Sequence, residues 1–165
     1  MAVCAAVESA QGYPILGRSG QDDLALDDGW PIFGRRGGQT GVATYPNCPL
    51  CDQSTETMRH LLTGCSFSRM VWFEVMSWIR STSGPPTVEG DFAEWWSLVV
   101  RTVPRQLRKG TSSIIMLTAW WIWKHRNAVV FDNARPSVTT LFSDIVAEAR
   151  QWADAGARGV RLLLP

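Results

Sequence analysis

Four cysteines in 165 residues are too few for a secreted scaffold built on disulfides. Glycine and proline, at 14 and 9 residues, are near their average frequencies, which excludes collagen-like and low-complexity chains. No uncharged run reaches the roughly 20 residues that a membrane-spanning helix needs. The formal net charge of +1 excludes a globally basic nucleic-acid binder but allows a local basic face. With 45% hydrophobic residues, the sequence is that of a folded chain of about one domain.

The first residues do not have the pattern of a secretory signal peptide. The apolar run from Met1 to Val7 lacks a basic leader and stops at Glu8, short of a signal-peptide core. We therefore expect an intracellular protein, in the nucleus or cytoplasm and not secreted. In that reducing environment cysteines stay as thiols or bind metal.

Changes in composition predict four regions along the chain. The first is a disordered tail that includes four aspartates within seven positions and shows no periodicity. A cysteine-containing segment with a following helix comes next. A linker rich in Ser, Gly and Pro then leads into a helical C-terminal region. The predicted bounds are 1–32, 33–80, 81–90 and 91–165.

Apolar residues recur at three- and four-residue spacing in the second and fourth regions, which predicts helices. The first helix is expected to cover about fifteen residues around 67–79. Asp91 and Glu94 have the spacing of a capping box at the start of the next helix. Two further helices are expected, one over 112–131 and one capped by Ser137.

Short breaks are expected between these helices, including one at Lys109-Gly110. No segment alternates between apolar and polar residues with a period of two. The predicted fold class is therefore all-α, with a small Cys3His segment followed by a bundle of about four helices.

Nine tryptophans lie mostly on the apolar faces of the predicted helices. Aromatic residues at helical spacing usually form core, although an aromatic stripe is also a platform for stacking nucleic-acid bases. The indoles of Trp120, Trp121 and Trp123 point in several directions around one helix. Some of them are therefore expected to be exposed or to face a partner.

The strongest chemical signal is a set of three cysteines and one histidine, spaced C-x2-C-x8-H-x4-C. The four residues are Cys48, Cys51, His60 and Cys65. Two thiolates separated by two residues can hold one ion from a tight turn, and three thiolates with one imidazole suit tetrahedral zinc. We expect one structural Zn²⁺, because the protein would fill all four coordination positions.

A short helix is expected to present the second pair of ligands. Thr55 would cap it, Glu56 would lie at its positive end, and Gly64 would end it in a left-handed conformation. Two alternatives stay open at this point: a redox Cys-x-x-Cys pair and a chance arrangement of buried residues. Cys4 is expected to be a free thiol. His125 is expected to be exposed or hydrogen-bonded and not a ligand.

The stretch from Cys48 to Trp72 resembles the reverse-transcriptase zinc-binding domain of plant non-LTR (LINE-type) retrotransposons. That family has Cys-x-x-Cys, then Glu-Thr, His-Leu, Cys and a tryptophan about seven residues later. The resemblance implies that the four cysteine and histidine residues are zinc ligands and that Glu56 and Trp72 support them. Residues 120–127 and Phe131 also resemble the helical tail that follows this domain, which suggests a detached C-terminal fragment of a retroelement protein.

The chain lacks the family's polymerase chemistry. No Tyr-x-Asp-Asp motif and no acidic cluster suited to two-metal nuclease chemistry occur. A nucleophile, a base and an orienting residue also cannot be assembled from the sequence. We therefore expect no enzymatic activity, no small-molecule substrate and no membrane partner.

Two functional hypotheses follow. The first is a zinc-stabilised module that binds RNA or DNA. Between Trp95 and Phe131 there are six basic and no acidic residues, a composition that favours phosphate contacts, although a solvated basic surface looks the same in sequence. The second is a protein-interaction or relic domain that binds zinc only to fold and once faced a reverse-transcriptase body. The candidate nucleic-acid contacts are Arg59, Arg69, Arg105, Arg108, Lys109, Lys124 and Arg126.

Overall fold

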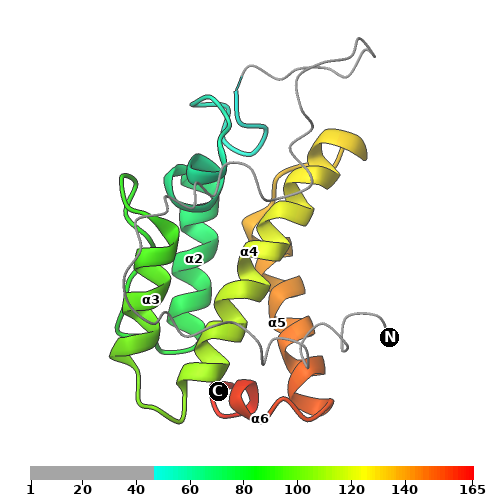
Figure 1. Cartoon of the computed structure of the whole chain (residues 1–165). Helices are drawn as coiled ribbons and strands as arrows, with labels where there is room; N and C mark the ends of the chain where they lie inside the picture. Colours follow the sequence, from blue (N-terminus) through cyan, green and yellow to red (C-terminus); the bar gives the residue numbers. More distant parts are fainter. Residues whose placement is uncertain (1–46) are drawn as a thin grey trace, which may run out of the picture. The chain divides into compact units, whose positions relative to one another are not determined.

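The computed structural model describes residues 47–165, so the predicted tail and Cys4 lie outside the described residues. Within 47–165 all the regular structure is helical and there is no strand, which confirms the all-α prediction (Figure 1). The elements are the π-helix η2 (His60–Gly64) and the α-helices α2 (Ser66–Trp78), α3 (Phe92–Thr102), α4 (Arg108–Phe131), α5 (Val138–Asp154) and α6 (Arg158–Arg161).

Two helices begin at the capping residues that the sequence indicates. The side chain of Asp91 accepts a hydrogen bond of 2.9 Å from the backbone N–H of Glu94 at the start of α3. Ser137 accepts one of 3.2 Å from the N–H of Thr140 at the start of α5. Each bond satisfies one of the N–H groups that a helix N-terminus leaves without a partner, so both predicted caps are confirmed.

The expected break at Lys109-Gly110 is wrong, because α4 already begins at Arg108 and runs through Gly110. Gly110 is buried where α4 crosses α6, and a Cβ atom added to it would overlap the carbonyl oxygen of Gly159. The glycine therefore allows two backbones to approach closely and does not end a helix. α6 itself was not predicted.

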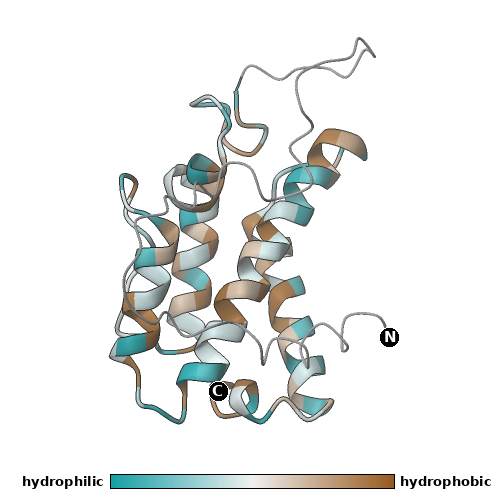
Figure 2. Cartoon of the chain, in the orientation of Figure 1, coloured by the Kyte–Doolittle hydropathy of each residue, from teal (hydrophilic) through white to brown (hydrophobic). Residues whose placement is uncertain are grey.

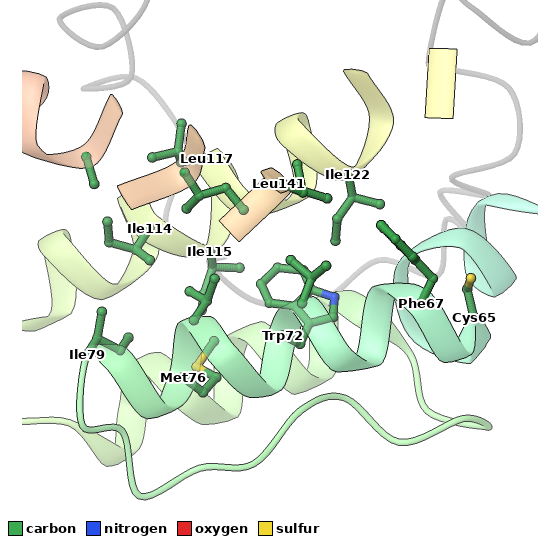
Figure 3. Packing of buried hydrophobic residues seen from close by; sticks show 14 of the residues in the cluster. Cys65, Phe67, Trp72, Met76, Ile79, Ile114, Ile115, Leu117, Ile122 and Leu141 are labelled. Atoms are coloured by element: carbon green, nitrogen blue, oxygen red, sulfur yellow. The ribbon is translucent and has the colours of Figure 1, made fainter. Parts of the chain in front are cut away.

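The hydrophobic core lies between α2, α4 and α5, and α3 packs against the outer side of α2 and α4. Figure 2 shows apolar and polar residues interleaved along these helices, as expected for amphipathic elements. Figure 3 shows Trp72 and Met76 of α2 among aliphatic residues of α4 and α5. Fully buried members of this cluster include Trp72, Val75, Ile114, Ile115, Ile122, Leu141 and Ile145.

The predicted linker 81–90 joins helices that pack against each other. The ring of Trp72 in α2 lies 5.8 Å from Phe92 and 5.0 Å from Trp95 of α3, measured between ring centroids. The division of the chain at this stretch stays a prediction, but the helices on both sides of it share one core. None of the helices in residues 47–165 is long and apolar enough to cross a bilayer.

Candidate metal centre

The three cysteines and one histidine of the sequence motif converge on one point. The potential ligand atoms of Cys48, Cys51, His60 and Cys65 all lie within 4.8 Å of one another. The Sγ atoms of Cys48 and Cys65 are 3.9 Å apart, and Cys51 Sγ lies 3.3 Å from His60 Nε2. A tetrahedral zinc ion spaces two sulfurs by about 3.8 Å and a sulfur and nitrogen by about 3.6 Å, so the observed separations fit it.

A disulfide does not account for this arrangement. The 3.9 Å between Cys48 and Cys65 is almost twice the length of a sulfur–sulfur bond, about 2.05 Å, and the three cysteines in residues 47–165 are free thiols. The α/β context of a redox Cys-x-x-Cys pair does not occur in the described residues. The donor set and its spacing therefore favour metal binding.

The first ligand pair comes from a tight turn. The carbonyl oxygen of Cys48 accepts hydrogen bonds from the N–H groups of Cys51 at 3.3 Å and Asp52 at 2.8 Å. Asp52 has a φ of 55°, a left-handed conformation that aspartate tolerates better than most residues. A third bond, from the N–H of Cys48 to the carbonyl of Ser54, closes the loop at 2.8 Å. The turn thereby places both thiols on one side.

The second ligand pair consists of the first residue of the π-helix η2 and the residue just after its end. The N–H of Cys65 donates a 2.6 Å hydrogen bond to the carbonyl of His60, five residues earlier. This π-turn hydrogen bond joins the first residue of η2 to Cys65, which lies just past the helix, as predicted. Because Cys65 is extended and also precedes α2, the metal segment continues directly into the core (Figure 3).

Two local expectations about this helix are wrong. Thr57, not Thr55, supplies the cap, and its Oγ1 accepts a 2.9 Å bond from the N–H of His60. Gly64 is not left-handed, since the only glycine with positive φ in residues 47–165 is Gly156. The π-turn ends through the extended residue after it, so no left-handed residue is needed. A Cβ on Gly64 would lie 3.3 Å from Nδ1 of His60, so the glycine leaves room for that ring.

The electrostatics of the two buried sulfurs favour a bound cation. Cys48 and Cys65 are both fully buried. A hydrogen bond donated by the Cys48 thiol lowers the pKa of Cys65 to about 5, and the same bond, together with burial, raises the pKa of Cys48. One thiolate is therefore stable beside one thiol, whereas two thiolates need a nearby positive charge. A Zn²⁺ ion supplies that charge and binds the thiolate forms.

An ion pair connects the metal loop to α4. Arg126 donates from Nε to Oε1 of Glu56 and from Nη2 to Oε2, each at 2.7 Å. The two side chains are 20% and 13% exposed. These hydrogen bonds to Glu56 raise the pKa of Arg126. Glu56 thus pairs the metal loop with a distant helix, a partner that sequence reasoning missed because the residues are 70 positions apart.

Trp72 makes a second contact with the metal segment. Its side chain is fully buried, and its Nε1–H donates a 2.9 Å hydrogen bond to the carbonyl of Leu62 in η2. That carbonyl lies in a π-helix just before the last ligand. Trp72, seven residues after Cys65, therefore links α2 to η2 through this hydrogen bond and to α3 through ring contacts with Phe92 and Trp95.

His125 lies outside the ligand cluster, as expected. Its Nε2 accepts a 3.2 Å hydrogen bond from the N–H of Ser137, and its ring stacks on Phe67 at 5.4 Å. Burial lowers the pKa of His125, and the charge of Asp144 opposes this in part. The imidazole is therefore a neutral packing group that connects α4 to the start of α5.

The predicted nucleic-acid contacts do not form one patch. Arg59 donates to the carbonyl of Glu89 at 2.8 Å beside the metal segment. Arg108, the first residue of α4, donates to the carbonyls of Val103 and Arg101. Arg105, Lys109 and Lys124 are exposed, Arg69 is partly buried, and Arg126 is paired with Glu56. Contact of any of these residues with nucleic acid stays a prediction.

The fold and the cluster define a helical zinc-binding unit with one Cys3His site. Residues 34–72 match the family model described as zinc-binding in reverse transcriptase. The matched stretch includes all four cluster residues and ends at Trp72. The comparisons with curated proteins and with solved structures gave no match. The match over this stretch and the Cys3His cluster together support a zinc-binding segment with a site for a single zinc ion.

Proposed function

We propose that the chain is a non-catalytic module in which one zinc ion stabilises residues 48–65 and the helical region binds nucleic acid. The observation that carries the proposal is a basic end formed where α3 leads into α4. Four cationic side chains occur there, and all four are exposed. Because the sequence from Trp95 to Phe131 contains no acidic residue, nothing in α3 after Glu94 or in α4 offsets their charge. The basic end comprises Arg101, Arg105, Arg108 and Lys109.

The zinc ion in this proposal has a structural role. Cys48, Cys51, His60 and Cys65 supply a full tetrahedral set, so no coordination position is left for a water molecule or a substrate. When bound, zinc would cross-link the turn at 48–52 to both ends of η2. The ion pair of Glu56 then holds the ordered segment against α4, and the hydrogen bond of Trp72 holds it against α2.

The engagement of both histidines supports a role without catalysis. The chain has two, and these are the residues that most often act as general bases near neutral pH. His60 Nε2 faces Cys51 in the zinc cluster, and His125 Nε2 already accepts a hydrogen bond from Ser137. We also propose that the segment derives from a plant non-LTR (LINE-type) retrotransposon protein, which the spacing of the motif and the family match support.

A salt titration tests the nucleic-acid proposal. Binding of the zinc-loaded chain to a labelled DNA duplex is measured by fluorescence anisotropy over a range of salt concentrations. If the basic end neutralises four phosphates, log K falls with log[salt] at a slope of about −3.6. The double variant Arg105→Gln/Lys109→Gln should reduce that slope by about 2.

Arg135→Gln is the matched control, because Arg135 is exposed but follows the opposite end of α4. It should leave the slope unchanged. A salt-independent interaction, or an equal loss of slope in the Arg135 variant, would overturn the proposal.

An exposed hollow beside α2 favours a second candidate, a docking role on a reverse-transcriptase body. Met70 and Phe73 are 52% and 59% exposed. With Pro85 and Val138 they line an open hollow of about 430 Å³ that also contacts Arg69 and Glu74. Large exposed apolar side chains in one place are typical of protein contacts. A Phe73→Ser variant that abolishes binding to a reverse-transcriptase body while nucleic-acid binding persists would support this second role.

A further inference from the structure

α4 has a second apolar face on the side away from the core. Met116, Trp120, Trp123 and Phe131 recur at spacings that bring them to one side of the helix, here called the Trp120 face. The exposed fractions of Met116 and Trp120 are both 43%, and that of Phe131 is 65%. The core residues, such as Ile114 and Ile122, lie on other sides of the same helix. A helix that is apolar all round is usually covered, so this face is suited to a partner.

Two indoles of the Trp120 face form a preorganised flat surface. The rings of Trp120 and Trp123 are stacked, with centroids 4.8 Å apart and an angle of 30° between their planes. The neighbouring Trp121 points elsewhere: its Nε1–H donates to Glu148 of α5 at 2.6 Å. The ammonium of Lys124 lies 3.8 Å from the centre of the Trp121 ring, which keeps a positive charge one turn from Trp120.

The charge along α4 indicates what kind of partner fits. The helix contains no acidic residue over its 24 positions. Lys109, from the basic end, precedes Trp120 by 11 residues, or about three turns, so the two residues lie close to the same side of the helix and about 16 Å apart along its axis. The Trp120 face therefore continues into the basic end. A polyanion with flat apolar groups matches both parts, whereas a second copy of the chain would place like charges together.

We propose that the Trp120 face binds single-stranded nucleic acid, with one base stacked on the open side of Trp120 and the phosphate backbone directed toward Lys109. This inference rests on the proposed nucleic-acid function and specifies its ligand. Single strands are favoured over duplexes because only unpaired bases can present their ring faces to an aromatic side chain. Stacking tolerates any base, so no sequence preference is expected.

The test uses the zinc-loaded full chain and labelled single-stranded oligothymidylate, with binding followed by fluorescence anisotropy. Trp120→Ala should weaken binding about 5- to 150-fold, the range expected for one stacked base. Trp120→Phe keeps a flat ring and should restore most of that loss. The slope of log K against log[salt] should be the same in all three proteins, because none of these changes removes a charge.

Phe73→Ala is the matched control, since Phe73 is a similarly exposed aromatic residue on α2. It should bind oligothymidylate as the parent does, and circular dichroism should show equal helicity for every variant. Duplex DNA of equal length should be insensitive to Trp120→Ala. Weaker duplex binding by the same factor would overturn the preference for unpaired bases.

The two proposals fail in different ways. If Trp120→Ala binds oligothymidylate normally while Arg105→Gln/Lys109→Gln reduces the salt slope, the stacking site is wrong and the basic end stands. If Trp120→Ala abolishes binding that has no salt dependence, the stacking site stands and the basic end is wrong. Absence of binding to any oligonucleotide overturns both. A change in sedimentation with Trp120→Ala, without a change in binding, would identify the face as a contact between copies and overturn the stacking site.

Discussion

Breaking the ion pair between Glu56 and Arg126 should loosen the zinc segment without touching a zinc ligand. The perturbation is Glu56→Gln, which keeps the shape of the side chain and removes its charge. The guanidinium of Arg126, whose side chain is 20% exposed, then has no carboxylate to balance its charge. An exposed pair contributes about 0–1 kcal/mol, and breaking a buried one costs about 3–5 kcal/mol. Since Glu56 is only 13% exposed, we expect a loss of about 2–4 kcal/mol in the free energy of unfolding.

Part of this loss should be visible as weaker zinc binding. Glu56 lies in the loop between Cys51 and His60, so its pairing with α4 orders both ligand pairs before the ion arrives. Each 1.4 kcal/mol of ordering that is lost corresponds to about a tenfold lower affinity. Denaturant unfolding of the zinc-loaded protein and competition with a chromogenic chelator measure the two effects separately.

A double-mutant cycle isolates the interaction from the loss of each side chain. Arg126→Met keeps much of the aliphatic stem, and the double variant with Glu56→Gln contains no unpaired charge at this position. We expect the double variant to be more stable than the sum of the single changes predicts, by about 1.5–3 kcal/mol.

The chain offers a matched control in a second ion pair. Arg161 lies 3.8 Å from Asp154, and the side chains are 64% and 84% exposed. Asp154→Asn should change the free energy of unfolding by less than about 1 kcal/mol and leave zinc affinity unchanged. If Glu56→Gln is as harmless as Asp154→Asn, or if the cycle shows no coupling, the pair does not fasten the loop and the reasoning is refuted.

Three further changes have defined outcomes. Gly110→Ala should destabilise the chain by about 2–3 kcal/mol, because its Cβ would overlap the backbone of α6, whereas Gly84→Ala, with open space around it, should be nearly neutral in denaturant unfolding. Trp72→Phe should cost about 2–4 kcal/mol in the same assay, since it leaves the carbonyl of Leu62 without its donor and opens a cavity; a loss below about 1 kcal/mol would contradict this. Burial lowers the pKa of His125 below its ordinary 6.5, so the stabilisation from its neutral form should be complete above pH 6.5 and decrease as the pH falls below it. Between about pH 7.5 and 5.5, calorimetry should show a smaller loss of stability for zinc-loaded His125→Gln than for the zinc-loaded parent. An equal loss in both proteins would exclude His125 as the cause.

The zinc site was predictable because its determinants are local. Ligand spacing limits which residues a short loop and a helical turn can bring together, so Cys48, Cys51, His60 and Cys65 could be selected without a structure. The caps at Asp91 and Ser137 were predictable for the same reason, since a cap binds an N–H only two or three residues away.

Two of the misses, at Gly110 and Arg126, share a physical cause, which is contact between residues distant in sequence. Gly110 indicated a break until α6 was seen to cross it. Arg126 looked like a cation free for phosphate, and only the fold brings Glu56 to it across 70 positions. The π-turn at η2 was not predicted for a different, local reason, since a wider turn has no sequence signal comparable to a cap. Because this turn ends through the extended residue Cys65, Gly64 does not need a left-handed conformation.

The arrangement of α4 separates the tasks of the zinc segment from those of the basic end. Arg126 contacts Glu56 of the zinc loop near the C-terminus of α4, whereas Lys109 lies near the N-terminus of α4, about 26 Å away along the helix axis. Screening at physiological salt acts over about 8 Å, so the charge of the zinc site has little direct influence on phosphates bound at the basic end. We therefore propose that zinc would affect nucleic-acid binding only through the order of the fold. Cys51→Ser should lower the zinc affinity, yet at zinc concentrations that saturate the variant its salt slope should equal that of the parent. A reduced slope in the saturated variant would place phosphate contacts at the zinc segment itself, near Arg59.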